Sequence, residues 1–140
     1  MNKKVFGKGI LVGVAMAVVN LVLNLIMNAV YPASKAIYEN NTIFRPMTDP
    51  LMGLFWLYPI VLGLAFACIY DKTKTLYKEE SVTKKGLKFS LMYLFIAAIP
   101  AFFINFSSFN LPFGIVISWT LMSYLNGLVA GLILAKLDNK

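Results

Sequence analysis

Three asparagines recur at four-residue intervals within a long uncharged segment near the start of the chain. Asn20, Asn24 and Asn28 lie between Gly9 and Ser34, a stretch without Lys, Arg, Asp or Glu. At about 100° per residue, the three amides fall on one face of a helix. A carboxamide both donates and accepts hydrogen bonds. This face can therefore bind another helix or a polar solute.

Further polar side chains are expected at the same depth in other apolar segments. Asn105, Ser118 and Trp119 should lie, with the asparagines, in the outer half of a bilayer. Two prolines inside apolar segments, Pro59 and Pro100, each remove one helical hydrogen bond and favour a kink. This set has two interpretations. Its members pack helices together, as is common in membrane spans, or they line an outward-facing polar cavity.

A second candidate for chemistry is the ion pair that Arg45 and Asp49 could form, four residues apart in a turn-rich segment. An exposed pair of this kind could bind an anion or take part in catalysis. However, Asp49 directly precedes Pro50, and an Asp N-cap followed by proline is a regular signal for the start of a helix. We therefore expect Asp49 to cap a helix, and Arg45 to pair with it or with Glu39.

The residue types that most enzymes need are scarce in this chain. It has no histidine and a single cysteine, Cys68, so the commonest metal ligand and neutral-pH acid or base is missing. The apolar segments contain no Asp, Glu or Arg, whereas proton-coupled transporters and voltage sensors normally need a charge inside the membrane. We predict a protein that is not an enzyme and has no catalytic residue, metal or cofactor.

Four apolar spans must position these side chains. The 140 residues are 59% hydrophobic, above the roughly 45–50% of soluble domains. A helix needs about 20 apolar residues to cross a membrane, and the uncharged run from Phe89 to Ala135 is long enough to cross twice. The sequence predicts an all-α polytopic membrane protein, a single domain with four transmembrane helices in a bundle. The spans are expected at about 5–31, 50–70, 87–105 and 111–135.

The connections between the spans differ in charge, and this difference predicts the orientation. All but two of the 13 Lys and Arg residues lie near the termini or between residues 71 and 88. Positive charges mark the cytoplasmic segments of membrane proteins. We therefore expect a multi-pass protein of the cell membrane with both termini cytoplasmic. Residues 32–49 should form an outer loop, 71–86 a basic cytoplasmic loop and 106–110 a short outer turn.

Charge and small residues together predict the partners. The net charge of +7 follows from the topology, and it favours contact with anionic lipid headgroups at the inner face over contact with nucleic acid. Small residues recur every four positions, as at Gly9 and Gly13 in the first span and at Gly127 and Gly131 in the fourth. Such seams let helices approach closely. They suit packing within the chain, a homo-oligomer or a larger membrane complex.

Three segments carry a resemblance to known proteins: Phe44–Met52, Leu57–Pro59 and Ser118–Lys136. They are similar to small four-span membrane proteins of bacteria and archaea that have no known activity. The resemblance covers most of the chain and implies a four-helix membrane fold. It transfers no functional residue.

The sequence thus favours a small non-catalytic membrane protein with an accessory, scaffolding or lipid-interacting role. Such a role needs no residue type that the chain lacks. The alternative is a passive facilitator or binder of a small neutral or amphipathic solute, which would use the outward-facing polar cavity. An enzyme is the third class, because general acid–base and metal chemistry have few candidate residues here.

Overall fold

The computed structural model describes residues 2–40, 42–78 and 81–139, and every regular element within them is helical. The elements are α1 (Lys3–Val30), α2 (Ala33–Tyr38), the 3₁₀ turn η1 (Pro50–Met52), α3 (Gly53–Thr73), the 3₁₀ turn η2 (Lys74–Leu76), α4 (Val82–Tyr93), the π turn η3 (Leu94–Ala98), α5 (Ile99–Ser108) and α6 (Phe113–Asp138). The predicted all-α fold class is confirmed. In long apolar segments a helix satisfies each backbone N–H within its own segment.

Four helical segments are long and apolar enough to cross a membrane: Lys3–Val30, Pro50–Leu76, Val82–Ser108 and Phe113–Asp138. Each contains 26 to 28 residues, or about 40 Å of helix at 1.5 Å per residue. This length exceeds the ~30 Å thickness of a hydrocarbon core. The prediction of four apolar spanning helices is confirmed at the level of length and composition.

The helices extend beyond the apolar runs from which the spans were predicted. Helical structure continues through η2 to Leu76, and α4 begins at Val82 rather than near Leu87, so most of the segment expected as the loop 71–86 is helical. Lysine is a good helix former and can prolong a helix past its apolar part. Likewise, α5 continues to Ser108, and the expected outer loop contains the short helix α2.

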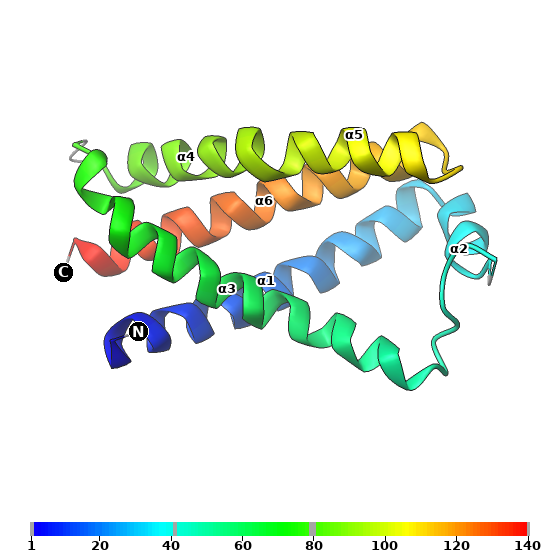
Figure 1. The fold of residues 1–140 in the computed structure, drawn as a ribbon, viewed down its shortest axis with the longest axis horizontal. Coiled ribbons are helices and arrows are strands. Elements are labelled where there is room, and N and C mark those ends of the chain that lie inside the picture. Colours follow the sequence, from blue (N-terminus) through cyan, green and yellow to red (C-terminus); the bar gives the residue numbers. More distant parts are fainter. Residues whose placement is uncertain (1, 41, 79–80, 140) are drawn as a thin grey trace.

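Both ends of the chain lie at the same end of the molecule, beside the connection between α3 and α4 (Figure 1). We call this the lysine-rich end, after the lysines of residues 3–8, 72–88 and 136. The opposite end, which contains α2 and residues 39–40, 42–49 and 109–112, is called the α2 end. The segment from α4 to α5 runs alongside α6, while α1 and α3 cross each other and diverge toward the α2 end.

Three glycines bring α1 and α3 into close contact where they cross. A Cβ atom added to Gly63 would lie 2.5 Å from both the Gly13 nitrogen and the Gly9 oxygen. A Cβ atom added to Gly13 would lie 2.7 Å from the Ile60 Cα. Backbones this close leave no room for a side chain, which is the usual reason for small residues between membrane helices. The glycine seam of the first span is therefore used within the chain.

A second glycine crossing joins α4 to α6. A Cβ atom added to Gly131 would lie 2.6 Å from the Gly86 oxygen, and one added to Gly127 would lie 3.0 Å from the Tyr93 ring. Gly86 is the counterpart of the predicted seam in the fourth span. Gly86 was not predicted as part of a seam, because the third span was expected to begin at residue 87, one residue after it. The seams of α1 and α6 thus both pack inside the chain.

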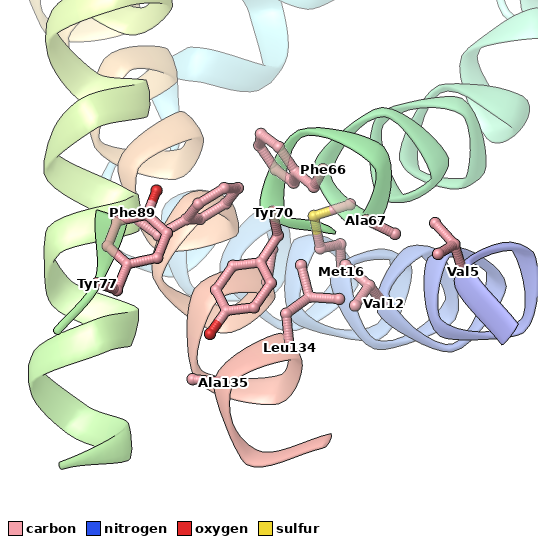
Figure 2. Close-up of a cluster of buried hydrophobic side chains, with 11 residues drawn as sticks. Val5, Val12, Met16, Phe66, Ala67, Tyr70, Tyr77, Phe89, Leu134 and Ala135 are labelled. Carbon is pink, nitrogen blue, oxygen red and sulfur yellow. The ribbon is translucent and has the colours of Figure 1, made fainter. Parts of the chain in front are cut away.

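The larger of two buried apolar clusters lies between α1, α3, α4 and α6, in the half of the molecule nearer the lysine-rich end (Figure 2). Phe66 is 2% exposed, and its ring makes edge contacts with Phe89 and Tyr93 at centroid distances of 5.4 and 4.7 Å. Met16 and Leu134 pack in the same cluster and are also buried. These side chains fill the space between the helices in that half.

Ionic contacts join the ends of the helices at the lysine-rich end. The Asp138 carboxylate, at the end of α6, lies 3.3 Å from the Lys74 ammonium and 3.7 Å from the Lys8 ammonium. Lys74 also contacts Asp71 at 3.1 Å. Partly exposed pairs of this kind stabilise by only about 0–1 kcal/mol each. They contribute little to the free energy of unfolding, but they connect α1, η2 and α6 at this end of the molecule.

Candidate functional site

A hydrogen bond between two asparagines joins α1 to α6 deep within the molecule. The Asn126 Nδ2 donates to Asn20 Oδ1 at 2.9 Å. Asn126 is the 14th of the 26 residues of α6, so it lies at the middle of that helix, and its exposed fraction is 3%. Its Oδ1 atom has no hydrogen-bond partner among the described residues. A buried polar atom without a partner costs free energy.

A second set of polar side chains links α3, α4 and α6 at a similar depth. The Tyr93 hydroxyl interacts with the side chains of Tyr58 of α3 and Ser123 of α6. Ser123 precedes Asn126 by three residues, so both lie on neighbouring parts of one helix face. We call Asn20, Tyr58, Tyr93, Ser123 and Asn126 the polar layer. It links the four spanning helices with α6 as their common neighbour.

The other two asparagines of the α1 stripe remain exposed. Asn24 Nδ2 donates to the Asn20 carbonyl at 2.9 Å, within the same helix, and no described hydrogen bond involves the Asn28 side chain. At about 100° per residue, both lie on the face of α1 that carries Gly13. This is the face that α3 contacts at the crossing. The amides therefore continue the α3-facing side of α1 toward the α2 end.

Asn24 and Asn28 are exposed, and α1 and α3 diverge beyond the crossing (Figure 1). Trp56 lies seven residues before Gly63, two turns along the same face, and is 63% exposed. Its neighbour Phe55 makes an edge contact with it at 5.8 Å and is exposed as well. The diverging halves of α1 and α3 thus present amides on one helix and aromatic rings on the other. We call these facing surfaces the α1/α3 opening.

The remaining candidates for the polar cavity lie elsewhere, in the region where the α2 end packs on α6. Ser118 is buried and donates to the Ile115 carbonyl of its own helix at 2.7 Å. The Trp119 Nε1 donates to the Tyr38 hydroxyl at 2.7 Å, and burial raises the pKa of Tyr38 while this hydrogen bond opposes the rise. Asn105 is half-buried near the end of α5. These three do not join the polar layer.

Arg45 and Asp49 form a local structure at the start of the second span. Asp49 accepts a hydrogen bond from the Leu51 N–H at 2.8 Å and another from Arg45 Nη1 at 2.8 Å. The Leu51 N–H, followed by Arg45, holds the pKa of the Asp49 carboxyl below its ordinary value. Asp49 is the N-cap of η1, as predicted. Both oxygens of the Asp49 carboxylate therefore accept hydrogen bonds, and capping of η1 explains the pair without a role in anion binding or catalysis.

The two prolines have different effects. Pro59 is buried at the α1–α3 crossing, inside an α-helix that continues past it. Pro100 follows the π turn η3, in which the Ile99 N–H donates to the Leu94 carbonyl five residues earlier. Proline lacks an N–H and clashes with the carbonyl four residues before it, and a π turn absorbs such a change of register. This turn directly follows Tyr93 of the polar layer.

Two pockets lie away from the asparagines of α1, and one of them is lined in part by Tyr93 of the polar layer. One, of about 190 Å³, is an apolar groove between α3 and α4 that passes beside Phe66. The other, of about 410 Å³, lies between the first turn of α1 and the end of α3, beside Asn2 and Asp71. Among the described residues no group of three His, Cys, Asp or Glu side chains could hold a metal ion.

Of the five residues of the polar layer, the sequence pointed only to Asn20 as a polar contact. Asn126 was passed over, although an amide in the middle of a span is a signal of a polar contact. The sequence pattern assigned neither Tyr58 nor Tyr93 to a polar contact. The Tyr93 ring packs against α6 at Gly127, where an added Cβ atom would lie 3.0 Å from it. Distance along the sequence gives no indication of such a contact.

These features define a class: an all-helical chain with four membrane-length apolar helices and an uncharged polar layer between them. No family model matches the chain, and no curated protein and no solved structure is detectably similar to it.

Proposed function

We propose that the chain is a non-catalytic, multi-pass protein of the cell membrane, a four-helix bundle with its lysine-rich end in the cytoplasm. The positive-inside bias supports this orientation, because the lysines gather at the end where both termini lie (Figure 1). The α2 end then faces outward. The lysines of the opposite end lie where anionic headgroups of the inner leaflet attract them.

The orientation predicts which engineered cysteines an impermeant maleimide can reach. With Cys68 replaced by alanine, Asn40→Cys at the α2 end should label in intact cells. Thr83→Cys at the lysine-rich end should label only after permeabilisation. Both positions are exposed, so access to the side chain itself does not distinguish them. The reverse pattern would overturn the orientation, and labelling of both in intact cells would contradict it as well.

Within this class we propose a lipid-interacting role: the α1/α3 opening binds an amphipathic molecule from the outer half of the bilayer. The observation that carries the proposal is the exposure of Asn24 and Asn28 on a face that no described helix covers. Polar side chains at membrane depth normally find a partner. Trp56 and Phe55 supply an apolar surface on the opposite helix. Amides facing aromatic rings suit a molecule with a polar group and an apolar tail.

A bound amphiphile fits this face better than the helix of a protein partner. Membrane helices associate mainly through small residues. The four seam glycines are already in contact with α3 or α4: Gly9, Gly13, Gly127 and Gly131. The exposed part of α1 around the amides carries large side chains such as Leu21, Leu25 and Ile26. A homo-oligomer or a larger complex is thus the less favoured occupant.

Binding is also favoured over passage through the membrane. Below the polar layer, toward the lysine-rich end, Met16, Phe66 and Leu134 are packed with exposed fractions of 2% or less. The glycine crossings bring the backbones together in the same region. A solute that reached the polar layer from the α2 end would meet this closed apolar cluster. The proposal is therefore a one-sided binding site rather than a facilitator.

Quenching of tryptophan fluorescence tests the binding proposal. The chain has two tryptophans, and Trp119→Phe leaves Trp56 as the reporter in the α1/α3 opening. Brominated amphiphiles with uncharged, zwitterionic or anionic head groups are titrated into the purified protein in micelles. We expect at least one to quench Trp56 saturably and to be displaced by its unbrominated form. Replacing Asn24 and Asn28 together by leucine should weaken that binding roughly tenfold.

Asn110→Leu is the matched control, because Asn110 is an exposed asparagine outside the opening. It should leave the affinity unchanged. Quenching that rises linearly for every probe reflects partition into micelles and would contradict the proposal. Stoichiometric co-purification of a second membrane protein, combined with such linear quenching, would favour the accessory role instead.

A further inference from the structure

We infer that the Asn20–Asn126 pair forms the deep end of the α1/α3 opening and selects an uncharged head group that carries a hydroxyl. This inference rests on the proposed function and names the class of molecule that the opening binds. The observation behind it is the Asn126 oxygen, which is buried and has no partner among the described residues.

The Asn20–Asn126 pair makes fewer hydrogen bonds than its two carboxamides allow. Two carboxamides can exchange two hydrogen bonds, but here only one is made, from Asn126 Nδ2 to Asn20 Oδ1. This leaves the Asn126 oxygen as an acceptor, and no described hydrogen bond involves the Asn20 Nδ2. A single group that both donates and accepts would satisfy both atoms. A hydroxyl is such a group, whereas an ester or an ether can only accept.

The asparagines of α1 lead from the α2 end to this pair. From Asn28 through Asn24 to Asn20, the amides cover about 12 Å of helix at 1.5 Å per residue. Asn24 and Asn28 are exposed, Asn20 is half-buried and Asn126 is buried. The exposure of the amides to the surroundings therefore decreases along this polar face toward Asn126. A small polar group on a flexible chain can reach the end of this path, whereas the side of a helix cannot.

The depth of the pair excludes a charged head group. The uncharged runs Gly9–Ser34, Pro50–Tyr70 and Phe89–Ala135 contain all five members of the polar layer. A phosphate, a carboxylate or an ammonium group would meet no counter-charge there, and an unpaired ion at this depth is costly. A hydroxyl costs far less to bury and recovers that cost through its two hydrogen bonds.

The decisive experiment compares two probes that differ only in the head group. In the Trp119→Phe protein, 9,10-dibromostearoyl glycerol carries hydroxyls, whereas methyl 9,10-dibromostearate does not. We expect the glycerol ester to bind at least tenfold more tightly than the methyl ester. In the Asn126→Leu variant the affinity for the glycerol ester should fall roughly tenfold, to near the affinity for the methyl ester. The affinity for the methyl ester itself should change little. The anionic dibromostearate, measured at high pH, should bind no better than the methyl ester.

Thr120→Val is the matched control on α6. Its hydroxyl donates to the Val116 carbonyl within the same helix, and it lies about 120° around the helix from Asn126. It should leave both affinities unchanged. Equal affinity of the two probes, with no effect of Asn126→Leu, would overturn the inference but leave the proposed function standing. Absence of saturable binding by every amphiphile would instead remove the proposed function. The comparison of the two probes in the Trp119→Phe protein needs no change at Asn126, so a folding defect in Asn126→Leu does not affect it.

Discussion

Replacing Gly63 by alanine is expected to lower the stability of the folded protein by about 1–3 kcal/mol or more. The new methyl group would lie 2.5 Å from the Gly13 nitrogen and the Gly9 oxygen. Both are backbone atoms, so relief requires α1 and α3 to move apart along their whole contact. Unfolding of the purified protein in mixed micelles by added SDS, followed by tryptophan fluorescence, measures the loss.

Gly7→Ala is the matched control for this prediction. Gly7 lies in the same helix as Gly9 and Gly13, but a Cβ atom there would have nothing within 4 Å. Alanine is a better helix former than glycine by up to about 1 kcal/mol. We therefore expect Gly7→Ala to be neutral or slightly stabilising. If Gly63→Ala unfolds at the same SDS concentration as the unchanged protein, the close crossing is wrong, and with it the origin of the α1/α3 opening.

The second large effect is expected at Phe66. Replacing it by alanine should lower the free energy of unfolding by roughly 2–3 kcal/mol. Phenylalanine in a water-soluble core typically costs about 3–5 kcal/mol when truncated to alanine. Part of that value comes from transfer out of water, and this part shrinks when lipid surrounds the helices before they associate. What remains is the lost packing and the two edge contacts, with Phe89 and Tyr93. SDS titration again provides the measurement.

Phe103→Ala is the control for the change in residue type. Phe103 is 66% exposed on α5, where hydrocarbon can take the place of the lost ring. Its truncation should change stability by less than about 0.5 kcal/mol. Equal effects of the two substitutions would contradict the assignment of Phe66 to a tightly packed cluster that closes the lower side of the polar layer.

Much of the candidate site could be predicted from single-helix geometry, and the part that could not depends on a second helix. The four-residue spacing places Asn20, Asn24 and Asn28 on one face whatever surrounds them. Whether that face packs or stays open depends on α3, which contacts it at Gly13 and then diverges. The outcome differs along this face of α1. Asn20 forms a hydrogen bond with Asn126, whereas Asn28 is exposed.

The predicted cavity combined residues that lie at the same depth in the bilayer but in different parts of the helix bundle. Asn105, Ser118 and Trp119 were grouped with the α1 asparagines because each is a polar or aromatic residue in the same half of its span. In the structure Ser118 bonds within its own helix and Trp119 bonds to Tyr38 of α2. Depth follows from position along a span, but rotation about the helix axis and the choice of neighbour do not. The grouping therefore needed contacts that the sequence does not contain.

The sequence by itself determined that the chain folds as helices, that four of them are long and apolar enough to span a membrane, and that charge is absent from their interiors. These properties depend on composition and on local backbone hydrogen bonds, which each segment satisfies alone. Only the tertiary structure decided that the glycine seams close on neighbouring helices of the same chain. It also decided that Tyr93 lies beside Tyr58 and Ser123, that Asn126 pairs with Asn20, and that the outer α1 amides stay exposed. Each of these depends on how two helices cross, because close backbone contact at glycines fixes which side chains meet elsewhere along the same pair.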